Sequence, residues 1–139
     1  MFDQNLIGRT SEPQTFEITP AAVALFIEAT SDPVLANPAR DPLYVPLTFP
    51  TTIRVGVPGL KLDGSKMQLV HGEQEYQYTR SLRVGETLTC IARILDIREK
   101  SGRSGSMTII SSAIEGRDSK GELAFTARSS TIVRPMKTE

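Results

Sequence analysis

The chain holds one histidine, His71, and one cysteine, Cys90, so the side chains that most often do chemistry are scarce. A single cysteine cannot close an internal disulfide, and one histidine with one cysteine cannot complete the four-ligand set of a structural zinc site. No HExxH metal motif is present either. No metal site is therefore expected, and His71, as the only imidazole, is the first candidate for a role in proton transfer.

These side chains must be positioned by the elements around them, the first of which are a strand and a helix. Residues 15–18 alternate between polar and apolar types, which predicts a short strand. Thr19 followed by Pro20 matches a helix N-cap with proline at the first helical position. Ala21 to Thr30 continues with good helix formers that are apolar on nearly all sides, which predicts a buried helix. Ser31-Asp32-Pro33 ends it, and an aspartate there is most often a turn former or a cap.

A proline-rich stretch follows the helix. Residues 32–50 hold five of the nine prolines, which predicts an ordered loop longer than a compact domain usually has without a functional reason. Thr48 to Val57 is compatible with a second short helix, which Gly56, Pro58 and Gly59 would end.

From Met67 onward the pattern changes to long strands, expected at Met67–Arg80, Thr87–Arg98, Ser106–Glu115 and Glu122–Val133. Polar hairpin loops are expected at Lys100–Gly105 and Arg117–Gly121. In the second strand Leu88, Cys90, Ala92 and Ile94 share one face, so Cys90 is interpreted as a core thiol and not a nucleophile. Tyr76 and Tyr78 share a face of the first strand, with His71 on the opposite or the adjoining face depending on local bulges.

Length and charge limit the remaining possibilities. The chain has 139 residues, which predicts one domain spanning residues 1–139. Its 16 Lys plus Arg balance 16 Asp plus Glu, so there is no positive surplus to attract nucleic acid, and close self-approach is permitted. No apolar run reaches the roughly 18 residues of a membrane span, and the first residues lack a signal-peptide core. A cytoplasmic location without membrane contact is expected.

Three blocks of sequence point to a family. Residues 26–33 resemble the motif F-A-x-A-x-G-D-x-N-P, and residues 46–50 resemble P-P-T-F-P. Residues 69–76 and 80–88 resemble L-H-G-E-Q-x-F followed by R-P-L-R-x-G-D-x-L. These are motifs of the MaoC-like hydratase and dehydratase family, in its N-terminal-type, fungal fatty-acid-synthase-like form. The resemblance implies an α+β hot-dog fold, in which a long antiparallel sheet of about five strands wraps around a central helix.

The resemblance also implies a chemistry. The family hydrates enoyl thioesters or dehydrates 3-hydroxyacyl thioesters without a cofactor. An aspartate and a histidine five positions apart, in G-D-x-N-P-x-H, hold the water and share the two proton transfers. A backbone amide at the start of the central helix polarises the thioester oxygen.

This chain departs from that motif at the reacting groups. Aligning Asp32 on the catalytic aspartate puts Asn37 where the histidine belongs. Two other registers put Leu35 and Arg40, or Asp41 and Pro46, at the two positions, so no register supplies both groups. N-terminal-type domains of the family often lack the dyad and pair with a chain that has it. The resemblance therefore implies a subunit of a 3-hydroxyacyl-CoA dehydratase or enoyl-CoA hydratase that lacks the dyad, binds substrate, and is inactive alone.

The same resemblance suggests substrate-binding residues and partners. Phe49, His71, Gly72 and Tyr76 are the candidates for contact with an acyl-CoA or acyl-carrier-protein thioester. His71 has two interpretations, a structural or interface histidine bonded within the sheet and a residue near the thioester, and Tyr76 with Tyr78 could line either an acyl tunnel or a dimer seam. A homodimer, or a heterodimer with a dyad-bearing hot-dog chain, is expected.

Basic residues near two turns also have two interpretations. Arg80 and Arg83 could meet a coenzyme A phosphate or be solvated surface charge, and the same holds for Arg98, Lys100 and Arg103. Two other functions stay open. A non-catalytic acyl-CoA-binding protein would also lack the dyad, and a hot-dog thioesterase would need a carboxylate near the central helix, which residues 48–59 do not contain.

Overall fold

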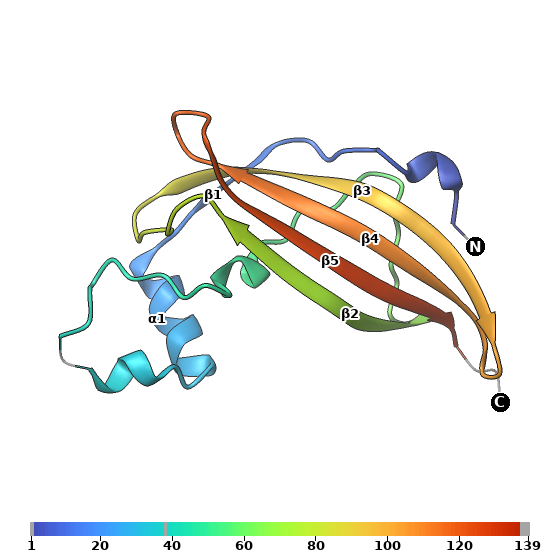
Figure 1. Ribbon diagram of the computed structural model, residues 1–139, viewed down its shortest axis with the longest axis horizontal. Coiled ribbons are helices and arrows are strands. Elements are labelled where there is room, and N and C mark those ends of the chain that lie inside the picture. The colour runs from blue at the N-terminus through green and yellow to red at the C-terminus, as the bar shows by residue number, and fades with distance from the viewer. Residues whose placement is uncertain (1, 38, 137–139) are drawn as a thin grey trace.

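The computed structural model describes residues 2–37 and 39–136, and over them the chain forms one curled antiparallel sheet with a helix at one end (Figure 1). The strands follow the order β1-β3-β4-β5-β2 across the sheet. In chain order the described elements are η1 (Gln4–Leu6), β1 (Gln14–Glu17), α1 (Pro20–Ala29), η2 (Pro33–Ala36), η3 (Phe49–Thr52), β2 (Met67–Tyr78), β3 (Thr87–Gly102), β4 (Gly105–Arg117) and β5 (Leu123–Pro135). The expected hot-dog arrangement of about five strands and one main helix is confirmed.

The helix α1 begins as the sequence predicts. The Thr19 hydroxyl accepts a hydrogen bond from the Ala22 amide at 3.1 Å, and Pro20 is the first helical residue. Only Val23 and Ile27, one turn apart, are buried, whereas Leu25 is 68% exposed. The expectation of burial on nearly all sides was therefore wrong, because α1 packs a single stripe against the sheet end and leaves its other face open.

The second helix is mostly absent. Only Phe49–Thr52 forms a helical turn, and residues 53–66 cross the concave side of the sheet as irregular chain (Figure 1). Thr51, Thr52 and Ile53 are β-branched, and Gly56 and Pro58 follow closely, so the segment has a low propensity to continue as a helix.

Two bulges decide which side chains face inward. In β3 the register shifts between Ile94 and Asp96, so Ile97 and not Asp96 continues the buried face. In β2 it shifts between His71 and Glu73. A bulge reverses the alternation of side chains beyond it, so His71 faces the same concave side as Tyr76 instead of the opposite one.

The β3–β4 hairpin is longer than predicted. Gly102 pairs with Gly105, which leaves Arg103 and Ser104 as a two-residue turn, so the strands extend into the loop expected at Lys100–Gly105. Gly105 has φ of 103°, a left-handed conformation that favours glycine in such turns.

The two margins of the sheet differ. On one side the N-terminal segment runs along β3, where the amides of Gly8 and Ser11 donate to the carbonyls of Ile94 and Ala92 at 2.8 Å, and β1 pairs with residues 87–90. On the other side β2 has no strand along its outer edge among the described elements. No helix in the described part of the chain is long and apolar enough to cross a membrane.

Candidate functional site

The degenerate motif after α1 serves the local backbone. One oxygen of the Asp32 carboxylate accepts a hydrogen bond from the Val34 amide at 3.0 Å, and the other accepts from the Tyr44 hydroxyl at 3.2 Å. Burial and the nearby Asp32 charge raise the pKa of Tyr44, so this phenol stays a donor. The Asn37 side chain accepts from the Ala39 amide at 2.9 Å. The interpretation of Asp32 as a cap is confirmed, and the residue five positions on, Asn37, is an amide.

The start of the shortened second helix is also occupied. The amides of Phe49, Thr51 and Ile53 donate to the carbonyls of Pro46, Thr48 and Pro50 at 3.0 Å. The Tyr78 hydroxyl donates to the Leu47 carbonyl, and burial, with a smaller contribution from Tyr76, raises the pKa of Tyr78 to about 12. The amides of Phe49, Thr51 and Ile53 therefore donate within their own segment.

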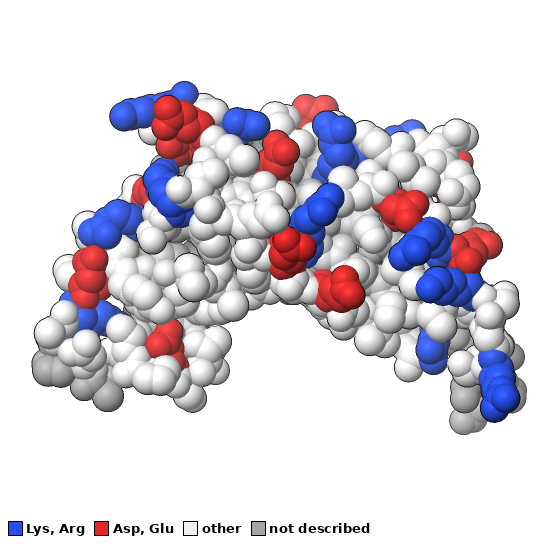
Figure 2. Space-filling model, viewed as in Figure 1, with Lys and Arg blue, Asp and Glu red and all other residues white. Residues whose placement is uncertain are grey.

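A cavity lies between the concave face of the sheet and residues 50–62. Its volume is about 570 Å³. The crossing segment contributes apolar walls at Ile53, Val55, Val57, Leu60 and Leu62. The sheet contributes apolar side chains and a polar group, which we call the polar floor: His71, Gln74, Ser112, Ser129 and Thr131. Figure 2 shows a broad recess in the outline of the molecule, between the α1 end and the hairpin end.

The polar floor is held by hydrogen bonds within the sheet. The Ser112 and Ser129 hydroxyls are 3.2 Å apart, and the Gln74 side chain donates to the Arg128 carbonyl at 3.0 Å. His71 Nε2 lies 3.0 Å from the Glu73 carbonyl, which can only accept, so Nε2 donates and the second ring nitrogen, Nδ1, is not used in this bond. The floor therefore offers a ring nitrogen and hydroxyl groups to a ligand, but no carboxylate.

The four predicted substrate-binding residues do not come together. His71 lines the cavity, whereas Phe49 is buried in the core with its ring 5.6 Å from that of Phe26, and Tyr76 packs against the same core. Gly72 is at the bulge, where an added Cβ would contact Ile132 on the other face of the sheet. Four further residues of the cavity lining were not predicted from the sequence: Gln74, Ser112, Ser129 and Thr131. The available signal was a run of small polar residues at inward strand positions.

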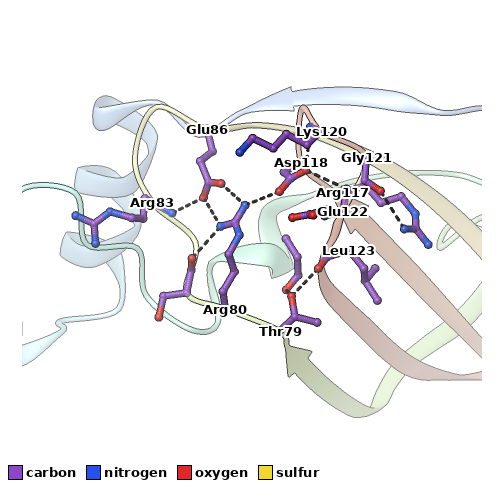
Figure 3. Close-up of polar contacts among 12 residues, drawn as sticks. Thr79, Arg80, Arg83, Glu86, Arg117, Asp118, Lys120, Gly121, Glu122 and Leu123 are labelled. Atoms are coloured by element: carbon purple, nitrogen blue, oxygen red, sulfur yellow. Dashed lines mark hydrogen bonds and ion pairs between the residues drawn. The ribbon is translucent and has the colours of Figure 1, made fainter.

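The Arg80 guanidinium is engaged by two carboxylates (Figure 3). It binds Glu86 through two hydrogen bonds, at 2.5 and 3.1 Å, and Asp118 at 3.2 Å. Hydrogen bonding to Glu86 raises the pKa of Arg80, and backbone donation from Glu122 with the Arg80 bond lowers the pKa of Asp118. This network joins the β2–β3 turn to the β4–β5 loop, which favours a structural role over phosphate binding.

Of the other candidate basic residues, two form ion pairs with carboxylates and two are exposed. Arg83 pairs with Asp41 at 3.3 Å, and Arg98 pairs with Asp96 at 3.1 Å. Lys100 and Arg103 are exposed near the tip of the β3–β4 hairpin.

Cys90 is a core residue, as predicted. Its side chain has 0% exposure, and burial raises the pKa of the thiol from 9.0 to about 11. A neutral thiol enclosed in this way is not a nucleophile.

This shift predicts a loss of stability in alkali. Between pH 9 and pH 11 the unfolded chain loses the thiol proton while the native chain retains it, so deprotonation favours unfolding. We expect the unfolding free energy of the wild type to fall by about 2 kcal/mol more over this window than that of Cys90→Ala, measured by urea titration at each pH. Parallel pH profiles for the two proteins would contradict the prediction.

Residues 5–127 match the family described as the FAS1-like dehydratase domain region. The chain belongs to this family of MaoC-like hot-dog dehydratases. A UPF0336 protein of Thermobifida fusca is 31% identical to the FAS1-like dehydratase chain, over 95% of the chain and 93% of that protein. A UPF0336 protein of Streptomyces avermitilis is 29% identical, over 95% of each.

Solved structures resemble the FAS1-like dehydratase chain in fold. The HadBC (3R-hydroxyacyl-ACP dehydratase) complex of Mycobacterium tuberculosis gives a TM-score of 0.67 at 19% identity, covering 91% of this chain and 96% of that one. The ChsH1-ChsH2 complex of the same organism gives 0.67 at 17%, covering 93% and 86%. A MaoC-like dehydratase gives 0.69 at 16%, covering 93% of this chain and 42% of that one. The shared fold is the hot-dog domain.

Proposed function

We propose that this chain is the substrate-binding subunit of an acyl-thioester hydratase or dehydratase, and that a second hot-dog chain supplies the Asp/His dyad. The proposal rests on the two positions where the family has its catalytic aspartate and histidine. Both oxygens of Asp32 are bound to Val34 and Tyr44, and Asn37 stands where the family has its base. An amide does not titrate near neutral pH, so Asn37 cannot take a proton from water.

The roles proposed for the two chains follow from the reaction. Hydration adds the oxygen of water to the β carbon of an enoyl thioester and a proton to the α carbon, and dehydration reverses both transfers. The dyad-bearing chain would perform these transfers. This chain would hold the acyl group in the cavity beneath the sheet, whose volume of about 570 Å³ lies in the usual range of small-molecule sites.

Two structural relatives support a paired assembly. HadBC and ChsH1-ChsH2 are both described as complexes of two named components, and HadBC is described as a 3R-hydroxyacyl-ACP dehydratase. The unpaired edge of β2 gives this chain a surface through which a partner sheet could continue.

The test is reconstitution. The purified chain is assayed for hydration of crotonyl-CoA and a longer trans-2-enoyl-CoA, alone and with the dyad-bearing hot-dog chain encoded nearest to it. We expect no turnover alone and turnover on mixing. In the mixture, Asp32→Asn and His71→Ala should each retain activity within about threefold, since neither residue transfers a proton and loss of a true acid–base group costs roughly 10²–10⁴-fold.

Two results would overturn the proposal. Robust turnover by the isolated chain that either variant abolishes would assign the chemistry to that residue. Binding of acyl-CoA with no turnover in the presence of the dyad-bearing chain would instead indicate a non-catalytic acyl-CoA-binding protein.

A further inference from the structure

The polar floor forms a band across a face of the sheet that is otherwise largely apolar. In the strand registers its residues make two adjacent rows. One row has His71 opposite Thr131, and the other has Gln74 opposite Ser129, which in turn lies opposite Ser112. The bulge in β2 brings the two rows together on the concave side, although they are separated by an odd number of residues along that strand.

Apolar side chains lie on both sides of this band. The next row toward the hairpin end contains Val133, which has 0% exposure. The next row toward the α1 end contains Ala127 opposite Ile114, and both belong to the core clusters. A ligand chain that runs along the strands in this cavity therefore passes over apolar surface, then the polar floor, then apolar surface again.

The hydroxyl groups of the floor have hydrogen-bonding capacity that their own contacts leave unused. One of the Ser112 and Ser129 hydroxyls donates to the other, so the hydrogen of the second remains available. Among the described residues the Thr131 hydroxyl has no hydrogen-bond partner. All three side chains are partly buried at the base of the cavity. A ligand that covers them therefore displaces the water that would otherwise satisfy them.

A plain alkyl chain is a poor match for this surface. Covering a hydroxyl with hydrocarbon removes its water and offers no hydrogen bond in return, whereas an oxygen atom on the ligand replaces the water. The floor contains no carboxylate, lysine or arginine, and Arg54 lines the cavity from the crossing segment. The ligand group that matches hydroxyl donors and acceptors is therefore a neutral oxygen.

We propose that the acyl group bound by this subunit carries a hydroxyl or keto oxygen beyond its β carbon, and that the hydroxyl groups of Ser112, Ser129 and Thr131 bind this oxygen. The inference rests on the proposed function, because it takes the cavity as the acyl site. The α and β carbons react at the dyad of the other chain, so the oxygen bound by the floor is a second one, distinct from the oxygen added or removed in the reaction.

The experiment compares unreactive, saturated thioesters that differ by one oxygen. Decanoyl-CoA, and derivatives with a single hydroxyl on each even-numbered carbon beyond the β carbon in turn, are titrated calorimetrically into this chain, alone and mixed with the dyad-bearing chain. We expect the best hydroxy derivative to bind roughly tenfold more tightly than decanoyl-CoA, the difference that one well-placed neutral hydrogen bond makes. In Ser112→Ala/Ser129→Ala/Thr131→Val this preference should fall below about threefold, because the hydroxyl groups are gone.

The matched control is Ser111→Ala/Ser130→Ala. These two serines lie opposite each other in the same β4–β5 register, each one residue away from a serine of the floor, but on the other face of the sheet. The control should keep the wild-type preference. Thermal melts show whether the variants fold, and if the triple variant does not, Thr131→Val alone should still reduce the preference roughly threefold.

Each other outcome has a distinct meaning. Equal affinity of the wild type for decanoyl-CoA and every hydroxy derivative would overturn the inference, as would a preference that the triple variant retains. Equal weakening of all the thioesters in the triple variant would overturn it too, because the floor would then bind the pantetheine arm that they share. If reconstitution gives turnover without the preference, only this inference fails. If the preference is found but reconstitution gives no turnover, the proposed function fails, and absence of binding by every thioester would overturn both.

Discussion

The Gly116→Ala variant is expected to lose about 3 kcal/mol of unfolding free energy, although it adds only one methyl group. A Cβ built on Gly116 would lie 2.1 Å from Cε1 of Phe125 and 2.7 Å from two further ring atoms. Phe125 is opposite Gly116 in the β4–β5 register and has 0% exposure. The ring has no solvent-exposed side to move toward, so β4, β5 or both must shift. Urea denaturation followed by circular dichroism measures the loss.

A matched glycine separates this steric effect from the general effect of alanine in a strand. Gly102 in β3 has nothing within 4 Å of a built Cβ, so Gly102→Ala should change stability by no more than about 0.5 kcal/mol. If Gly116→Ala does not fold, the double variant Gly116→Ala/Phe125→Leu should fold, because the smaller side chain makes room for the methyl group. A Gly116→Ala protein as stable as Gly102→Ala would contradict the prediction.

Ser129→Leu is expected to impair the reconstituted enzyme with long substrates selectively. Ser129 is part of the polar floor and bonds to Ser112, so a leucine there fills cavity space and removes that hydrogen bond. Overfilling a packed site costs about 1–3 kcal/mol, or roughly 5- to 150-fold. We expect kcat/KM for a long trans-2-enoyl-CoA to fall by roughly tenfold or more. The value of kcat/KM for crotonyl-CoA should change by less than about threefold.

The neighbouring serine is the control. Ser130 is the next residue of β5 and points to the other face of the sheet, so Ser130→Leu should leave both substrates unaffected. Thermal melts of the two variants show whether Ser129→Leu acts through the cavity or through stability. Equal losses with short and long substrates, or equal losses in the two variants, would mean that the acyl chain does not occupy this cavity.

The sequence predicted the elements whose signals are local. Alternating side chains located all four long strands, and the Thr19–Pro20 pair located the start of α1, because capping and alternation act over a few residues. It also predicted that Cys90 and its strand neighbours face the core.

The site itself depends on features that the sequence does not encode in one place. The orientation of His71 follows from a bulge at Gly72, and a one-residue insertion in a strand is invisible in an alternating pattern until the partner strand is known. The polar floor joins residues of β2, β4 and β5 that are up to 60 positions apart, from His71 to Thr131. The crossing segment at 53–66 had no periodicity to predict, because its conformation is set by the sheet beneath it.

The N-terminal segment along β3 limits how far an assembly of these sheets can grow. Gly8 and Ser11 satisfy carbonyls of β3, and β1 then ends this margin after four residues, with Pro13 beside it. Among the described elements, the chain is therefore left with one long unpaired edge, that of β2, for strand addition. If two five-stranded sheets joined through their β2-type edges, both long open edges would be used, so elongation would stop at a closed pair and no fibre would form.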